Sequence, residues 1–192
     1  MIGGIWNIPN ILTMGRILAA PLLILLFLVF EERTAAPIAL ALFTIAALTD
    51  FIDGWVARRF DMSSPIGQML DPIADKAMVL IALMLLLALH AGQGLPWLLA
   101  LPVTAIVLRE VLVSGLREYL GDVKLPVTRL AKWKTTAQLV ATGLLLAALP
   151  GAIGPALHPA GLAVLWIAAG LTLISGWDYF RKGLGHVAAR KE

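Results

Sequence analysis

The sequence predicts an all-α fold, a polytopic membrane protein in which six transmembrane helices form a bundle behind a short N-terminal interfacial segment. Of its 192 residues, 60% are hydrophobic and only 14% are charged, whereas soluble domains are about half apolar and about a quarter charged. The mean hydropathy is +0.89, and the apolar stretches are separated by turns rich in Gly, Pro or charge. We therefore expect a single membrane domain, residues 1–192.

Residues 1–10 are predicted to lie at the membrane interface, because Trp6 suits the headgroup level and Asn10 is a suitable N-cap for the first span. The start of the chain lacks the features of a cleaved signal peptide, so we expect none. Each predicted span has close to the ~20 residues that a bilayer requires. The six spans are expected at about residues 11–30, 36–59, 66–90, 96–119, 131–149 and 160–182.

Local composition explains the breaks between these spans. A short turn at residues 59–64 joins the second span to the third, and Pro65 has the fixed φ that suits the first turn of a helix. Two glycines and a proline interrupt residues 92–96, residues 120–130 are polar, and residues 150–159 are rich in Gly and Pro.

Basic residues are unequally divided between the two predicted faces. One face would carry only Arg33, and the other would carry Arg58, Arg59, Arg117, Lys124, Arg129, Lys132, Lys134, Arg181, Lys182, Arg190 and Lys191. Because cytoplasmic loops are enriched in Lys and Arg, both termini and the turn at residues 59–64 are predicted to face the cytoplasm.

Four aspartates interrupt the second and third spans near the turn that joins them. Asp50 and Asp53 are three residues apart, and Asp71 and Asp75 are four apart, so each pair lies on one face of a helix. A helical hairpin brings the two pairs face to face at one depth. Charge within a membrane is costly, which makes these residues candidates for a functional site.

Divalent metal ions are the natural partners of such a cluster, because four carboxylates repel one another without cations. Oxygen ligands favour Mg²⁺, Mn²⁺ or Ca²⁺ over zinc, and the chain has no Cys and only three scattered His. Gly54 and Gly67 lie one turn from the acids and leave room for a bulky ligand. Arg58 indicates that this ligand carries phosphate.

A second group of charges interrupts the fourth and fifth spans. Arg109 and Glu110 lie within an otherwise apolar helix, and Arg117 and Lys134 follow. An intramembrane arginine is a candidate functional residue, although pairing with Glu110 or another buried acid is an alternative. Together, Arg109, Arg117 and Lys134 could bind an anionic headgroup, most simply a second phosphate.

The acidic hairpin resembles the signature of the CDP-alcohol phosphotransferases, a family that transfers a substituted phosphoryl group from a CDP-linked donor to an alcohol and releases CMP. Every position of that signature is filled here, as Asp50-x2-Asp53-Gly54-x2-Ala57-Arg58-x8-Gly67-x3-Asp71-x3-Asp75. Three flanking motifs, NIPNILTMGRI, REVLVSGLRE and KWKTTAQ, are similar to those of the phosphatidylglycerophosphate synthases within this family. The likeness runs from about residue 7 to 140.

This resemblance implies an enzyme of phospholipid biosynthesis in the cytoplasmic (inner) membrane, commonly a homodimer. Its donor would be CDP-diacylglycerol and its acceptor sn-glycerol 3-phosphate. Two Mg²⁺ or Mn²⁺ ions would be held by Asp50, Asp53, Asp71 and Asp75, and Asp75 would also be the general base. The expected donor contacts are Thr13, Arg16, Gly54, Arg58, Ser64 and Gly67, and the expected contacts to the acceptor phosphate are Arg109, Arg117 and Lys134.

Other functions are less consistent with the pattern. Inositol phosphate or phosphatidylglycerol could replace the acceptor, whereas serine and choline lack the phosphate that the basic residues would bind. An ion transporter would place its charges near the midplane and often repeat them in two halves, but here the acids cluster near one face in one half. A structural scaffold would not require four acids at helical spacing.

Overall fold

The computed structural model describes residues 8–60, 65–91, 94, 96–121 and 129–189. Within this part of the chain, six long α-helices and one short 3-10 helix account for the regular structure, and there is no strand. The helices are α1 (Ile8–Val29), α2 (Glu32–Phe60), α3 (Pro65–Leu89), α4 (Trp97–Leu120), α5 (Arg129–Ala147) and α6 (His158–Ala189), with η1 (Pro155–Leu157) before α6. The predicted all-α class is confirmed.

Five of these helices are long and apolar enough to cross a membrane, namely all except α5. Helix α5 has 19 residues, and its first two turns contain Arg129, Lys132 and Lys134, which lower its hydropathy. The structure therefore supports five of the six predicted spans by length and composition. At the remaining one, the fifth predicted span, it describes the helix α5.

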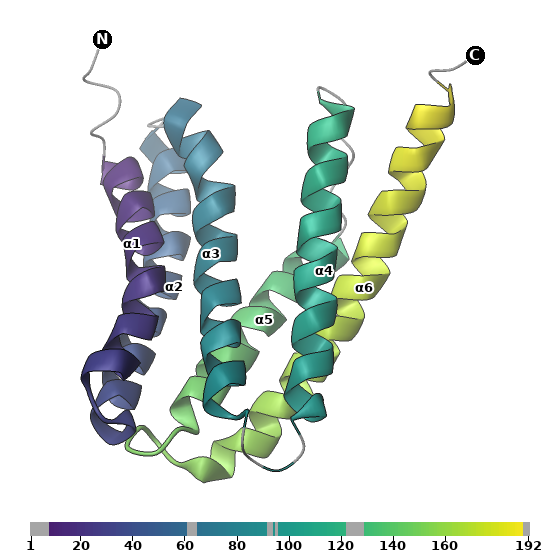
Figure 1. The fold of residues 1–192 in the computed structure, drawn as a ribbon. Helices are drawn as coiled ribbons and strands as arrows, with labels where there is room; N and C mark the ends of the chain where they lie inside the picture. Colours follow the sequence, from purple (N-terminus) through teal and green to yellow (C-terminus); the bar gives the residue numbers. More distant parts are fainter. Residues whose placement is uncertain (1–7, 61–64, 92–93, 95, 122–128, 190–192) are drawn as a thin grey trace.

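Two groups of helices make up the bundle (Figure 1). Helix α1 packs against α2 and α3, and α6 packs against α4 and α5, while α5 also contacts α2 and α3 and so links the groups. Leucines and alanines fill the interior: Leu23, Leu83, Leu86 and Leu145 are fully buried. Large apolar side chains such as Leu28 remain on the outside, as expected for a surface that faces lipid tails.

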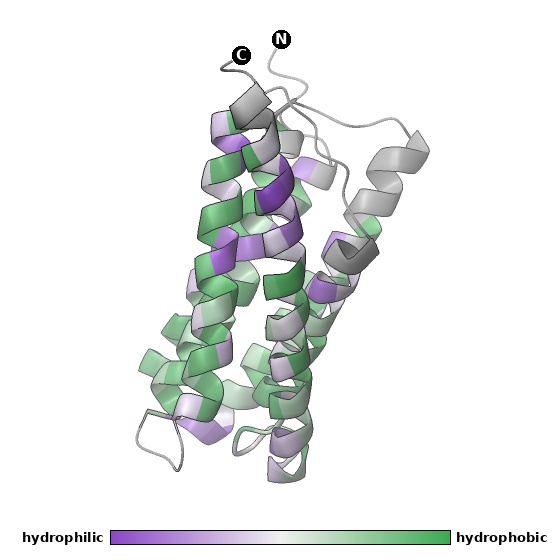
Figure 2. Cartoon of the chain, turned by 90° about the vertical axis from the view of Figure 1, so that its right-hand side faces the viewer, coloured by the Kyte–Doolittle hydropathy of each residue, from purple (hydrophilic) through white to green (hydrophobic). Residues whose placement is uncertain are grey.

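Hydrophilic residues lie toward the two ends of the bundle, with a larger group in the upper half. Figure 2 shows this upper group, a mainly hydrophobic middle, and further hydrophilic residues at the lower end. This upper half contains the first turns of α1 and α3 and the last turns of α4 and α6 (Figure 1). The acids of α3 and the basic residues of α4 therefore lie toward the same end.

The start of α1 corrects one expectation. Asn10 was predicted to be the N-cap of the first span, but α1 begins at Ile8, so Asn10 lies inside the helix and is only 1% exposed. Pro9 explains the earlier start, because proline suits the first turn of a helix. Residues 8–10 are therefore helical, and residues 1–7 of the predicted interfacial segment lie outside the described residues. The predicted helix start at Pro65 is confirmed.

Candidate active site

Three aspartates from α2 and α3 gather around one arginine of α1. The Arg16 Nη1 atom donates a hydrogen bond to Asp50 Oδ1 and another, of 2.7 Å, to Asp75 Oδ1. The Arg16 Nη2 atom lies 3.8 Å from Asp71 Oδ1. The Arg16 side chain is only 4% exposed, whereas the Asp50, Asp71 and Asp75 side chains are each about 40–50% exposed, so a ligand can reach the carboxylates.

Thr13 lies one turn before Arg16 on the same face of α1. Its Oγ1 atom donates a 2.6 Å hydrogen bond to Asp71 Oδ1, and it is buried. The resemblance implies that Thr13 and Arg16 contact the donor, and this stays a prediction. In the structure, both residues donate hydrogen bonds to the carboxylates and so orient them. Gly67 is buried one turn before Asp71.

The remaining predicted residues of this site are only partly described. Asp53, Gly54 and Arg58 belong to α2, but their side-chain positions lie outside the description. Ser64 lies outside the described residues altogether. The structure therefore brings together three of the four predicted acids.

The chemistry of this cluster fits hard divalent cations. Its described ligand atoms are carboxylate and hydroxyl oxygens, which Mg²⁺ and Mn²⁺ prefer. Three carboxylates with one guanidinium leave an excess of two negative charges, before Asp53 is counted. Within the described residues the carboxylates turn toward Arg16, and no group of three acidic or His side chains alone is arranged around a common metal position.

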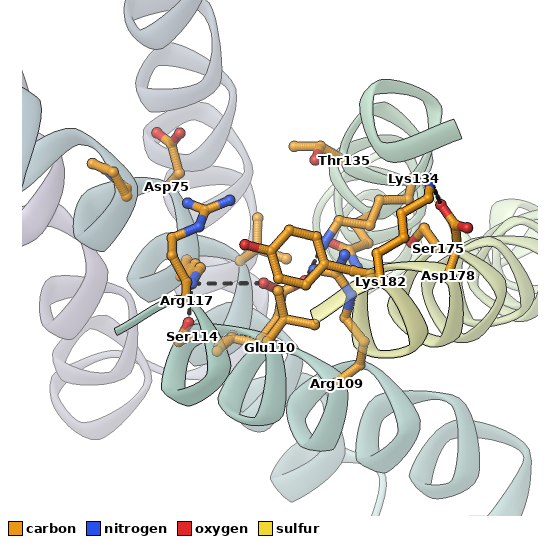
Figure 3. Close-up of a pocket in the computed structure, with 17 residues that line it drawn as sticks. Asp75, Arg109, Glu110, Ser114, Arg117, Lys134, Thr135, Ser175, Asp178 and Lys182 are labelled. Atoms are coloured by element: carbon orange, nitrogen blue, oxygen red, sulfur yellow. Dashed lines mark hydrogen bonds and ion pairs between the residues drawn. The ribbon is translucent and has the colours of Figure 1, made fainter. Parts of the chain in front are cut away.

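A cavity of about 240 Å³ lies between α3, α4, α5 and α6. Figure 3 shows labelled side chains converging on it from these helices. All three residues that the sequence assigned to the acceptor phosphate line this cavity: Arg109, Arg117 and Lys134. Its charged lining comprises Asp75, Lys76, Arg109, Glu110, Arg117, Lys134, Asp178 and Lys182.

Glu110 is the common partner of three basic side chains in this cavity. The Lys134 ammonium donates a hydrogen bond to Glu110 Oε1, and Arg109 Nη1 donates a 3.1 Å bond to the same atom. The Lys76 ammonium lies 3.9 Å from Glu110 Oε2. The sequence leaves open whether Arg109 pairs with Glu110 or lines a binding site. The structure shows both, because Arg109 bonds to Glu110 and also lies in the wall of the cavity.

Sequence reasoning missed Lys76 and the α6 wall of the cavity. Lys76 donates to Ser114 Oγ and lies near Glu110, so its described partners are both on α4. Neighbouring residues on a helix point about 100° apart, and this signal could have placed Lys76 on a different face of α3 from Asp75, although only helix packing shows that α4 lies there. On α6, Lys182 donates a 2.7 Å bond to Asp178 Oδ2, which gives Asp178 a partner.

Asp75 belongs to both halves of the site. It pairs with Arg16 in the acidic cluster, and it also lines the basic cavity. The acidic cluster and the basic cavity are therefore contiguous at this carboxylate. Such an arrangement can hold a cation-bound diphosphate on one side and an anionic alcohol on the other, with a proton acceptor between them.

Comparison with known proteins identifies the class. The sequence model of the CDP-alcohol phosphatidyltransferase family matches residues 6–174, and the chain belongs to this family. Its relatives include the CDP-diacylglycerol--glycerol-3-phosphate 3-phosphatidyltransferase of Cereibacter sphaeroides, which is 46% identical over 97% of this chain and 99% of the relative. The protein of the same name from Rickettsia typhi is 42% identical over 91% of this chain and 96% of the relative.

A relative with a different printed activity is also similar. The cardiolipin synthase (CMP-forming) of Oryza sativa subsp. japonica is 38% identical over 92% of this chain and 57% of the relative. The family assignment predicted from the acidic hairpin is confirmed.

Proposed function

We propose that this protein transfers the phosphatidyl group from CDP-diacylglycerol to sn-glycerol 3-phosphate, giving phosphatidylglycerophosphate and CMP in phospholipid biosynthesis. The observation that carries the proposal is the position of Asp75 between the acidic cluster and the basic cavity. Relatives that cover almost the whole chain carry this activity in their names, which supports the same donor and acceptor.

Asp75 is the proposed general base. It takes the proton of the 1-hydroxyl group of glycerol 3-phosphate, and that oxygen forms a bond to the β-phosphorus of the donor as the bond to CMP breaks. Two Mg²⁺ or Mn²⁺ ions would be held by Asp50, Asp53, Asp71 and Asp75, and when bound they would neutralise charge on the diphosphate. Thr13 and Arg16 keep Asp50, Asp71 and Asp75 oriented.

The donor is proposed to lie along the acidic cluster with its acyl chains in the bilayer. Gly54 and Gly67 would let the nucleotide approach the helices closely, because a glycine has no side chain. Arg58 would bind a donor phosphate, and Ser64 would also contact the donor.

The basic cavity is the proposed acceptor site, with Arg109, Arg117 and Lys134 on the phosphate. Five basic and three acidic side chains line it, an excess of two positive charges. A phosphomonoester carries about −1.5 to −2 at neutral pH, so this excess matches glycerol 3-phosphate. Serine, a zwitterion with no net charge, and choline, a cation, would leave the excess uncompensated.

We further propose six transmembrane spans, with α5 as the span that is polar on its cavity side. Both termini and the active site would face the cytoplasm, since basic residues concentrate at that end. The protein would act in the inner membrane as a homodimer, as is common in the family.

Phosphatidylglycerol is the alternative acceptor that a specific observation favours, because a cardiolipin synthase is among the relatives. Phosphatidylglycerol carries one phosphodiester charge, so it would compensate less of the positive excess in the cavity. Inositol phosphate, a phosphomonoester, would compensate it equally and must be tested directly.

The deciding experiment measures CMP release by the purified protein in detergent with CDP-diacylglycerol and Mg²⁺. The acceptors compared are glycerol 3-phosphate, inositol phosphate, inositol, serine and phosphatidylglycerol, with Asp75→Asn as the inactive control. Turnover with glycerol 3-phosphate alone is the expected result. Turnover only with another acceptor would overturn the acceptor assignment, and no CMP with any acceptor would overturn the proposed activity.

A further inference from the structure

Glu110 is a buried carboxylate to which the proposed function gives no role. It is 7% exposed, lies in the cavity wall and neighbours cations from three helices: Lys76 of α3, Arg109 of α4 and Lys134 of α5. We propose that Glu110 is the positioning residue of the acceptor-phosphate subsite, which holds these three side chains so that their remaining N–H groups face the cavity. This inference rests on the proposed function.

The donor count of the three cations supports this role. An ammonium group has three N–H donors and a guanidinium has five. Lys134 and Arg109 each direct one described donor to Glu110 Oε1, which leaves further donors for a second acceptor. A phosphate group offers several acceptor oxygens, so it can complete the hydrogen bonding that one carboxylate cannot.

The charge balance distinguishes a binding site from a structural ion pair. A buried ion pair is balanced when one acid meets one base. Here one acid neighbours three bases, and the whole lining, with five basic and three acidic side chains, has an excess of two positive charges. Glu110 therefore holds the cations in place without neutralising them, and the surplus is available to an anion.

Helix α6 supplies an independent constraint on Arg109. A Cβ atom at Gly176 would lie 2.6 Å from Arg109 Cγ and 3.2 Å from its Nε. The aliphatic part of Arg109 therefore packs directly on the backbone of α6, while its terminal Nη1 is held by Glu110. Both ends of this long side chain are fixed, which reduces the entropy lost when it binds phosphate.

The subsite also lies where the reaction needs it. Glycerol 3-phosphate carries its reacting hydroxyl and its phosphate at opposite ends of three carbon atoms. Asp75 and Lys76 are adjacent on α3 and line the same cavity, and Lys76 approaches Glu110. A phosphate on the Glu110-anchored cations therefore directs the other end of a short acceptor toward Asp75.

The test compares Glu110→Gln with Glu118→Gln, which removes the same charge from an exposed position two turns further along α4. Steady-state rates of CMP release are measured against each substrate in turn. For Glu110→Gln we expect the KM for glycerol 3-phosphate to rise by about tenfold or more, and the KM for CDP-diacylglycerol to stay within about twofold. Glu118→Gln should change neither. Unchanged or equally raised KM values in Glu110→Gln would overturn the proposal.

Coupling to Lys134 separates positioning from a merely structural role. If Glu110 acts through Lys134, the double variant Glu110→Gln/Lys134→Gln should have a KM for glycerol 3-phosphate close to that of Lys134→Gln alone. Additive losses in the double variant would contradict this. The double variant removes the buried Lys134–Glu110 pair together, so the Lys134 ammonium is not left without its carboxylate. It therefore remains testable where Glu110→Gln alone does not fold.

The conservative variant Glu110→Asp tests whether a carboxylate at this position restores acceptor binding. Glu110→Asp keeps the charge but is one methylene shorter, so its KM for glycerol 3-phosphate should fall between those of the wild type and Glu110→Gln. A Glu110→Asp variant as impaired as Glu110→Gln would overturn the proposal, because charge would then have no role. Wild-type protein that releases no CMP would overturn the proposed function itself, whereas active wild type with unaffected variants overturns only this inference.

Discussion

At the scale of single residues, the site depends on opposite charges that meet within the bundle. Arg16 is buried and joins Asp50 to Asp75, so the acids have a partner within the protein. An acidic cluster with one arginine still carries an excess of negative charge, which attracts divalent cations. Helix spacing alone predicts that the acids of each pair lie on one face of their helix. The hydrogen bonds from α1 then determine where the carboxylate groups point.

The first prediction concerns Asp71. Asp71→Asn keeps an Oδ1 acceptor for Thr13, so the variant should fold, but it removes one negative charge from the proposed metal site. We expect CMP release to fall by at least about a hundredfold while gel filtration and thermal unfolding stay unchanged. Glu31→Gln, at an exposed position between α1 and α2, is the control. Near-normal turnover of Asp71→Asn would contradict the metal assignment.

The second prediction concerns Arg109. A hydrogen bond to a charged group contributes about 1.5–3 kcal/mol, so Arg109→Ala should raise the KM for glycerol 3-phosphate about 10- to 100-fold and change that for CDP-diacylglycerol much less. Arg181→Ala removes an exposed basic side chain of α6 and should leave both KM values unchanged. An equal effect of Arg109→Ala on both substrates would refute the acceptor site.

At the scale of elements, the turn between α5 and α6 depends on a glycine. Gly151 has φ +86°, and a Cβ atom there would lie 2.6 Å from Arg33 Cα. The backbone of this turn therefore contacts the α1–α2 end of the bundle, in a conformation that suits glycine. Gly94 has a similar φ of +59°, but a Cβ atom there would meet nothing within 4 Å.

These two glycines give a matched prediction on stability. Gly94→Ala should cost about 1–2 kcal/mol for the left-handed conformation, and Gly151→Ala should add about 1–3 kcal/mol for overpacking. Thermal unfolding in detergent, followed by tryptophan fluorescence, should therefore give a lower Tm for Gly151→Ala than for Gly94→Ala. Equal Tm values would show that the contact with Arg33 is relieved at no cost.

At the scale of the whole molecule, the sequence predicts the helices and the acidic faces but not the partners that cross the bundle. Composition and hydropathy predict the all-α class, and Pro65 marks the start of α3, because these signals are local. The pairs Arg16–Asp75 and Lys134–Glu110 join residues 59 and 24 positions apart, so only the packing of helices reveals them. The partners of Lys76, Ser114 and Glu110, are hidden from the sequence for the same reason. The pair Asp178–Lys182 is four residues apart on α6, so helix spacing alone could have predicted it.

The last prediction tests the orientation of the bundle. The chain contains no cysteine, so a single introduced thiol can be labelled without background. Ala91 and Gly185 are both exposed, and they lie near opposite ends: Ala91 follows α3, whereas Gly185 is near the end of α6 (Figure 1).

By the positive-inside rule, the excess of basic residues near the end of α6 predicts that this end faces the cytoplasm. In cells whose inner membrane is intact, a maleimide that cannot cross it should label Ala91→Cys and spare Gly185→Cys until the membrane is opened. The reverse pattern would place the acidic cluster on the outer face, away from a cytoplasmic supply of glycerol 3-phosphate. Since the same end carries both the carboxylates and the basic cavity, this one measurement locates the whole proposed reaction on one side of the membrane.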